Sequence, residues 1–132
     1  MRREGLIHSL SSAIKGLIRR HIGSVVDLEA LLLVSGDRQR GWRAGDLARA
    51  LYISDSAANQ QIDKLVAGGF LHRQADGACF YLPDENVAQI VAELATAYEQ
   101  WRVRVIEYIY SRPSESVYGF ARAFRIKGDE DE

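Results

Sequence analysis

The sequence contains only one cysteine, Cys79, among its 132 residues. A single cysteine excludes a disulfide framework within the chain and fits a reducing compartment. No apolar run approaches the roughly 18 residues that a membrane span needs. No segment near the start has the pattern of a secretory signal. The sequence therefore predicts a cytoplasmic protein that does not bind or cross a membrane.

Residue patterns typical of catalytic and metal sites are also missing. His8, His21 and His72 are scattered along the chain, and Cys79 has no partner at metal-ligand spacing. The chain has no glycine-rich phosphate loop and no nucleophile elbow. We therefore expect no enzyme activity, no metal and no cofactor. We interpret Cys79, which precedes Phe80, as a small packed hydrophobe rather than a redox sensor.

An excess of positive charge, which most nucleic-acid binders carry, is absent as well. The chain has 17 Lys and Arg against 18 Asp and Glu, a formal net charge of −1 at pH 7. Residues 1–23 hold five cations and one acid. Residues 24–82 hold six cations and seven acids, and residues 83–132 hold six cations and ten acids. Four of these acids lie in the final GDEDE. This composition predicts a solvated, disordered tail over residues 128–132.

What the sequence does contain is helical periodicity interrupted by turn residues. Residues 1–23 form an amphipathic basic pattern that predicts a first helix. Residues 24–83 read as helix, short helix, turn, helix and hairpin, the order of a winged helix-turn-helix domain. Ser24 and Ser54 are suitable helix caps, Gly68-Gly69 suits a helix end, and Asp76-Gly77 predicts a two-residue hairpin loop.

The carboxyl-terminal third has the pattern of longer helices. From Asp84 to the stop at Pro113, apolar residues recur at alternating steps of four and three, as in a coiled-coil seam. The pattern predicts one helix roughly 40 Å long. A second amphipathic helix, capped by Ser114, completes residues 84–127. Such a helix is too long for the winged domain to cover alone, so residues 1–23 and 84–127 are predicted to mediate dimerisation.

The stretch DLARALYISDSAANQQIDKLVAGGFLHR resembles winged helix-turn-helix transcription regulators of the multiple antibiotic resistance regulator (MarR) family. The shared features are the small and apolar core positions, Ser54 and Ser56 at the start of the reading helix, and Gly69-Phe70-Leu71. The resemblance implies a mainly α fold and dimers formed through terminal helices that flank the winged domain. Two features depart from the family: Gln60 stands where an arginine is usual, and the wing tip, QADGA, carries no cation.

The candidate DNA-binding residues follow from the expected position of the reading helix in a major groove. Amide side chains suit adenine because one group both donates and accepts, so Asn59, Gln60 and Ser56 are the candidates for base edges. Contacts to the sugar-phosphate backbone are expected from Gln61, Lys64, Arg43 and Arg73. Ser54, which opens the helix, is a further candidate for DNA binding. A solvated helix face is the alternative interpretation of this polar run.

Dimer contacts are expected from the two apolar stripes, at Leu10, Ile14, Leu17, Leu94, Tyr98, Trp101, Val105 and Tyr108. The aromatic members, with Tyr110, could instead line a ligand pocket. The sequence favours a homodimeric regulator that binds double-stranded DNA at a two-fold symmetric operator. The alternative is a winged-helix module that binds a protein, such as a component of the transcription machinery, and the weak basicity of the reading helix and wing favours it.

Overall fold

The computed structural model describes residues 10–111, which form six helices and one two-stranded sheet within that range. Predictions for residues 1–9, for the helix after Pro113 and for the acidic end of the chain lie outside the described residues. None of the described helices is both long and apolar enough to span a bilayer. In chain order the elements are α2 (Ser12–His21), α3 (Val25–Ser35), α4 (Ala44–Leu51), α5 (Asp55–Ala67), β1 (Leu71–Arg73), β2 (Cys79–Tyr81), α6 (Glu85–Gln100) and α7 (Arg102–Ser111).

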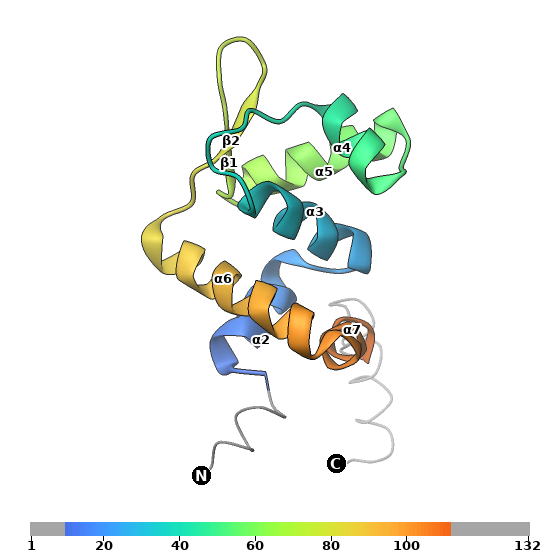
Figure 1. Cartoon of the computed structure of the whole chain (residues 1–132), viewed down its shortest axis with the longest axis vertical. Helices are drawn as coiled ribbons and strands as arrows, with labels where there is room; N and C mark the ends of the chain where they lie inside the picture. The colour runs from blue at the N-terminus through green and yellow to red at the C-terminus, as the bar shows by residue number, and fades with distance from the viewer. Residues whose placement is uncertain (1–9, 112–132) are drawn as a thin grey trace, which may run out of the picture.

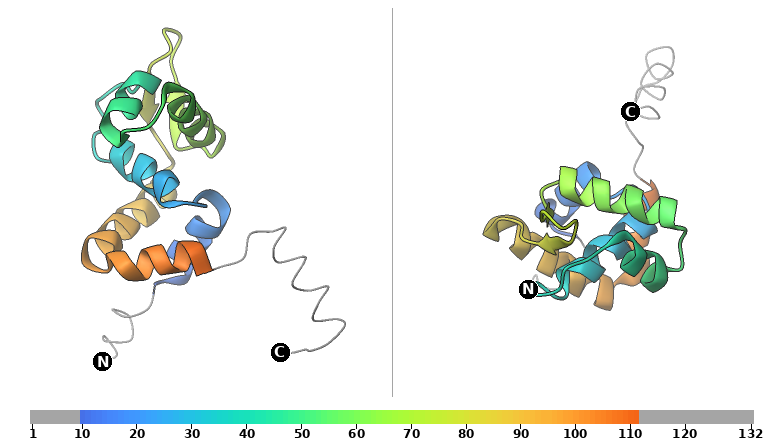
Figure 2. Two further views of the ribbon diagram at one scale, coloured as in Figure 1. Left: turned by 90° about the vertical axis from the view of Figure 1, so that its right-hand side faces the viewer. Right: turned by 90° about the horizontal axis from the view of Figure 1, so that it is seen from above.

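The elements form two halves that meet at α3 (Figure 1). The upper half is the helix-turn-helix pair α4–α5 with the β1–β2 wing, and the lower half is α2, α6 and α7. Figure 2 shows the same division from the side, with the wing farthest from α7. One hydrophobic core runs through both halves and includes Leu28, Leu31 and Val34 of α3. Because α3 packs against helices of both halves, it links the wing to the terminal helices.

Local signals place the helix starts where the sequence predicted them. Ser24 Oγ accepts a hydrogen bond from Asp27 N, and Ser54 Oγ accepts one from Ala57 N. Each side chain thereby satisfies an amide that has no partner within its helix. The predicted caps of α3 and α5 are confirmed, and α5 ends at Gly68 as expected.

The wing is an antiparallel pair in which Leu71 pairs with Tyr81 and Arg73 with Cys79. Beyond Arg73, Gln74 N donates to Ala78 O at 2.8 Å, so the loop has three residues, 75–77. The expectation of a two-residue Asp-Gly loop was therefore wrong. Gly77 closes the longer turn at φ +94°, a conformation that favours glycine. Cys79 is buried, and its backbone also pairs with that of Trp42.

The predicted single helix from Asp84 to Pro113 is broken. Trp101 leaves helical geometry at φ −135° and ψ +48°, separating α6 from α7. In Figure 1, α6 runs across the picture whereas α7 is seen end-on. The change of direction brings α7 against α2, where Arg19 donates a hydrogen bond to Tyr108 Oη at 3.2 Å. A continuous helix would have carried α7 away from this contact.

The apolar stripes assigned to dimerisation pack largely within one chain. Trp101 and Tyr108 are half-buried, whereas the other six are buried in the core shared by α2, α6 and α7: Leu10, Ile14, Leu17, Leu94, Tyr98 and Val105. The premise that these stripes need a second subunit to cover them was therefore wrong for those six residues. Their apolar character follows from the fold of the single chain and gives no evidence for a dimer.

Candidate nucleic-acid interface

The first half of α5 presents a polar, solvent-exposed face. Ala58, Ile62 and Leu65 anchor the opposite face in the core. Ser56, Asn59 and Gln60 remain exposed, as a reading helix requires. Asn59 Nδ2 donates to the carbonyl of Asp55 at 3.0 Å, a bond that does not use the amide oxygen of Asn59. Three of the predicted contact residues therefore share one accessible surface, whereas Ser54 acts as the helix cap.

Gln61 is not part of that surface. The residue is only 7% exposed, and its Nε2 donates to Asp27 Oδ1 of α3 at 2.9 Å. The prediction that Gln61 contacts a DNA backbone is therefore wrong, because the amide faces the core and is already hydrogen-bonded. Lys64 Nζ lies 3.0 Å from the same oxygen, so this cation is paired within the chain, although its side chain is 58% exposed.

Asp27 is the residue that holds α5 against α3, and sequence reasoning missed it. Asp27 is 8% exposed. Gly23 N donates to its Oδ2, while Gln61 and Lys64 both donate to its Oδ1. Burial alone would raise the pKa of Asp27, but the hydrogen bonds from Gln61 and Gly23 and the charge of Lys64 lower it overall. The available signal was the acid Asp27 within the apolar run VVDLEALLLV, in helical register with Leu31 and Val34.

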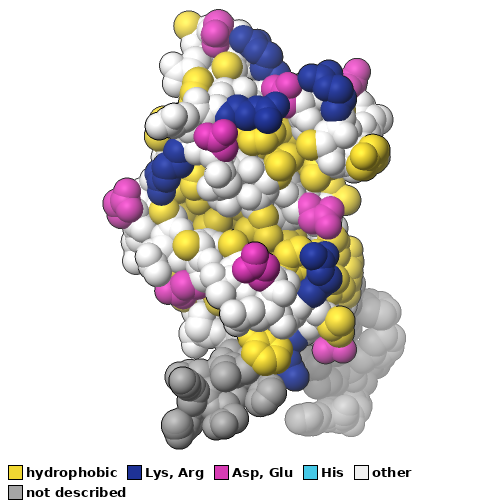
Figure 3. All heavy atoms as spheres, in the orientation of Figure 1, with side chains coloured by type: hydrophobic (Ala, Val, Ile, Leu, Met, Phe, Trp, Pro, Cys, Tyr) yellow, Lys and Arg dark blue, Asp and Glu magenta, His cyan; other side chains and the backbone are white. Residues whose placement is uncertain are grey.

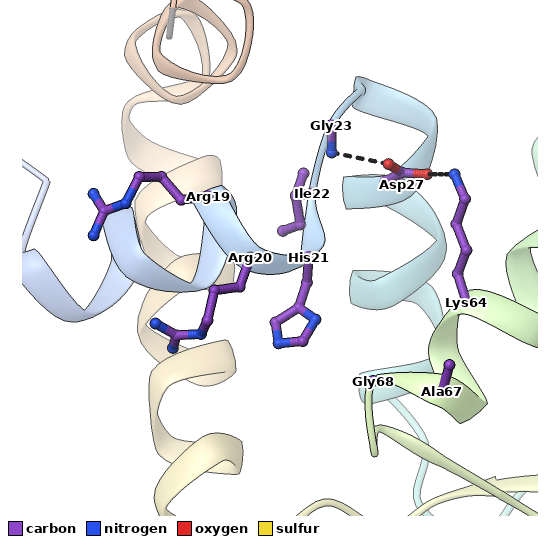
Figure 4. Close-up of a pocket in the computed structure, with 9 residues that line it drawn as sticks. All are labelled: Arg19, Arg20, His21, Ile22, Gly23, Asp27, Lys64, Ala67 and Gly68. Atoms are coloured by element: carbon purple, nitrogen blue, oxygen red, sulfur yellow. Dashed lines mark hydrogen bonds and ion pairs between the residues drawn. The ribbon is translucent and has the colours of Figure 1, made fainter. Parts of the chain in front are cut away.

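A groove of about 480 Å³ opens beside Asp27, away from the exposed first half of α5. It is lined by Arg19, Arg20, His21, Ile22, Gly23, Asp27, Lys64, Ala67 and Gly68 (Figure 4). The His21 ring packs edge-on against Phe70, and burial together with the charge of Arg20 lowers the His21 pKa. Figure 4 shows Arg19 and Arg20 pointing away from Lys64. The groove is cationic, but its cations do not converge on one point.

The arginines around the exposed face of α5 form ion pairs with acidic side chains. Arg43 bridges the start of α4 to the wing tip, donating to Asp76 O at 3.0 Å and lying 3.5 Å from its carboxylate. Arg73 of β1 pairs with Asp63 of α5 at 3.1 Å. The remaining cations of this part of the chain are also engaged: Arg40 and Arg49 pair with Asp46, and Arg38 lies over the Tyr81 ring.

Positive charge on this surface is consequently compensated at short range. Five ion pairs involve five of the six cations in residues 24–82. Figure 3 shows Lys and Arg side chains interspersed with Asp and Glu over the upper half of the molecule. The fold brings Arg43 and Arg73 to the wing side of α5, but each is already paired with a carboxylate.

Searches for matching family models and for curated relatives found none. Two solved structures are similar. One is MepR, a transcription regulator of the Staphylococcus aureus multidrug efflux pump MepA, with 14% identity, a TM-score of 0.49 and coverage of 96% of each chain. The other is a Lactococcus lactis ZitR mutant, with 16% identity, a TM-score of 0.47 and coverage of 79% of this chain and 72% of that one. The predicted fold class, mainly α with a winged helix-turn-helix, is confirmed by the order and pairing of the elements of this chain.

Proposed function

We propose that this chain is a DNA-binding transcription regulator of the MarR type. The observation that carries the proposal is the exposed polar surface of α5, flanked by a wing with Arg73 at its base. In this mode the first half of α5 enters a major groove. Asn59 and Gln60 then present amides to base edges, and Ser56 adds a hydroxyl.

Contacts to phosphates would come from Arg43 and Arg73, with Lys64 contributing less because Asp27 holds it. The ion pairs of Arg43 and Arg73 are solvent-exposed: their acids, Asp76 and Asp63, have side-chain exposures of 71% and 74%. Exposed pairs contribute only about 0–1 kcal/mol each. A DNA phosphate can therefore replace the carboxylate at little cost in free energy. The surface can thus be nearly neutral in the unbound protein and still bind DNA.

We propose further that the protein acts as a homodimer on a two-fold symmetric operator. Support comes from apolar side chains that the fold leaves uncovered in its described part, including Val103 (67% exposed) and Tyr110 (59% exposed) of α7. These two residues are seven positions apart and so share one helix face. This face replaces the buried residues Leu94 and Val105 as the proposed contact surface.

The dimer is testable by sedimentation equilibrium at micromolar concentration. The wild type should give one species near twice the 14.8 kDa chain mass. Val103→Asp should shift the population toward monomer without unfolding the chain, since the side chain is exposed and the change places a charge in an apolar contact. Arg104→Gln makes the same change in net charge at an exposed position of the same helix, off the face shared by Val103 and Tyr110, and serves as the control. A monomeric wild type would contradict the proposal.

DNA binding is tested by selection from random duplexes at low salt, followed by titration of variants. Gln60→Ala should reduce binding to the selected site by roughly 1–3 kcal/mol and leave other sequences nearly unchanged. Arg73→Ala should weaken binding to every sequence and lower the salt slope by about one unit per contact. Gln89→Ala and Arg104→Ala, exposed positions on α6 and α7, are the matched controls. No enrichment of any sequence, with neither variant affecting binding, would count against the proposal.

A second candidate function is supported by the ion pairs. A surface on which Arg40, Arg43, Arg49 and Arg73 are each paired with an acid resembles a mixed-charge protein contact more than a phosphate-binding face. In that case α5 would dock on another protein, for example a component of the transcription machinery. Removing the acids separates the two functions, because it should strengthen DNA binding only if phosphates meet these arginines.

A further inference from the structure

The turn between α4 and α5 contains an unusual residue. Tyr52 adopts φ +58° and ψ +47°, and it is the one non-glycine residue with positive φ among residues 10–111. This left-handed conformation is unfavourable for a bulky side chain, and glycine or asparagine usually occupies it. Tyr52 ends α4, and Ile53 N donates to Ala48 O as the chain turns toward α5. The hydrogen bonds of this turn are made by the backbone, so they do not depend on the tyrosine side chain.

The side chain of Tyr52 makes no contact that would offset this strain. It is 94% exposed, and no hydrogen bond or ring contact engages it within the described part of the chain. The other described tyrosines differ. Tyr98, Tyr108 and Tyr110 each accept a hydrogen bond at the hydroxyl, and Tyr81 is buried beneath Arg38. Tyr52 is thus a large aromatic side chain that the fold holds in solvent.

Its location places it beside the proposed DNA surface. Tyr52 lies two residues before Ser54, the cap of α5, and three after Arg49, whose side chain is 77% exposed. In a helix-turn-helix the first helix crosses the sugar-phosphate backbone and the second enters the major groove. In this mode the turn that joins α4 and α5 (Figure 1) would lie at the edge of the groove, where the sugar-phosphate backbone passes.

We propose that Tyr52 is a DNA-backbone contact, with its hydroxyl donating to a phosphate oxygen and its ring lying against the adjacent deoxyribose. Tyrosine hydroxyls are recurrent phosphate donors. The left-handed turn projects the ring away from the core, which is why folding gains nothing from it. The inference rests on the proposed DNA binding and adds a neutral contact to it. Because no charge is involved, this contact releases no counterion and leaves the salt slope unchanged.

The test compares wild type with Tyr52→Phe and Tyr52→Asn, using fluorescence anisotropy on the selected duplex and on a random duplex. Tyr52→Phe should weaken both by about fivefold through loss of one hydrogen bond. Tyr52→Asn, which also removes the ring, should weaken both by tenfold or more. Neither variant should alter the salt slope. In chemical denaturation, Tyr52→Asn should be at least as stable as wild type, because asparagine tolerates this backbone conformation.

Outcomes that overturn this inference differ from those that overturn DNA binding. If wild type binds DNA and Arg73→Ala weakens it while both Tyr52 variants bind normally, Tyr52 is not a contact and the regulator proposal stands. A less stable Tyr52→Asn would show that the ring serves the fold, which also overturns the inference. If folded wild type binds no duplex at low salt, the proposed function fails and the Tyr52 contact fails with it.

Discussion

Replacing Asp27 by alanine is expected to lower the free energy of unfolding by about 2–3 kcal/mol. The carboxylate accepts from Gly23 N, Gln61 and Lys64. Without it, the half-exposed Lys64 can turn to water, but the buried amide of Gln61 cannot, and an unsatisfied buried group is costly. For a chain of this size the melting temperature should fall by roughly 10 °C. Thermal unfolding measured by circular dichroism checks this.

The control is Asp37→Ala, in the exposed loop between α3 and α4. Asp37 accepts a hydrogen bond only from a nearby loop amide, that of Gln39, so its loss should leave stability within about 0.5 kcal/mol of wild type. If both variants have the same melting temperature as wild type, Asp27 does not hold α5 against α3. A matched loss in both would point to a general effect of removing negative charge.

The same carboxylate gives an acid dependence whose sign follows from its pKa. The Asp27 pKa is lower in the fold than its ordinary value of 3.8, so the ionised form is favoured by folding. Its contribution is complete above that ordinary value and is lost as pH falls through the lower, folded value. The stability gap between wild type and Asp27→Ala should therefore be smaller at pH 3 than at pH 7. An equal difference in unfolding free energy at the two pH values would show that the charge of Asp27 does not stabilise the packing of α5 on α3.

Local signals predicted much of the fold because they act over a few residues. The caps at Ser24 and Ser54, the end of α5 at Gly68 and the position of the wing all depend on neighbouring residues. The break at Trp101 does not, because the apolar pattern continues through it without glycine or proline. It reflects packing of α7 on α2, a contact between segments nearly ninety residues apart in sequence. Periodicity along one segment cannot report such a partner.

The candidate site was predictable to the same limited extent. Exposure of Asn59 and Gln60 follows from helical spacing relative to Ala58, Ile62 and Leu65. Gln61 has the spacing of the buried face, between Ala58 and Leu65, but its polarity suggested solvent. Its partner, Asp27, is 34 residues away. The pairing of each arginine with a particular acid likewise depends on the tertiary fold. These pairs matter most for function, because they decide how much positive charge is available to DNA.

Removing the acids that hold Arg43 and Arg73 should strengthen DNA binding. The double variant Asp63→Asn, Asp76→Asn frees both arginines and removes two negative charges per chain from the wing side of α5. Both acids are largely exposed, so the fold should lose little stability. If phosphates occupy these arginines in the complex, affinity for every duplex should rise by about tenfold or more at low salt, and less at high salt, where charge repulsion is screened. Titration of one duplex at several salt concentrations measures this.

A matched control separates local from general charge. Glu93→Gln, Glu99→Gln makes the same change in net charge on exposed positions of α6. It should raise affinity much less, because these acids lie on the half of the molecule away from the wing (Figure 1). Equal gains for the two double variants would mean that only overall charge matters. If neither variant gains affinity, Arg43 and Arg73 do not meet phosphates. Their pairs with Asp76 and Asp63 would then belong to a mixed-charge surface, and a protein partner for α5 would be the better account.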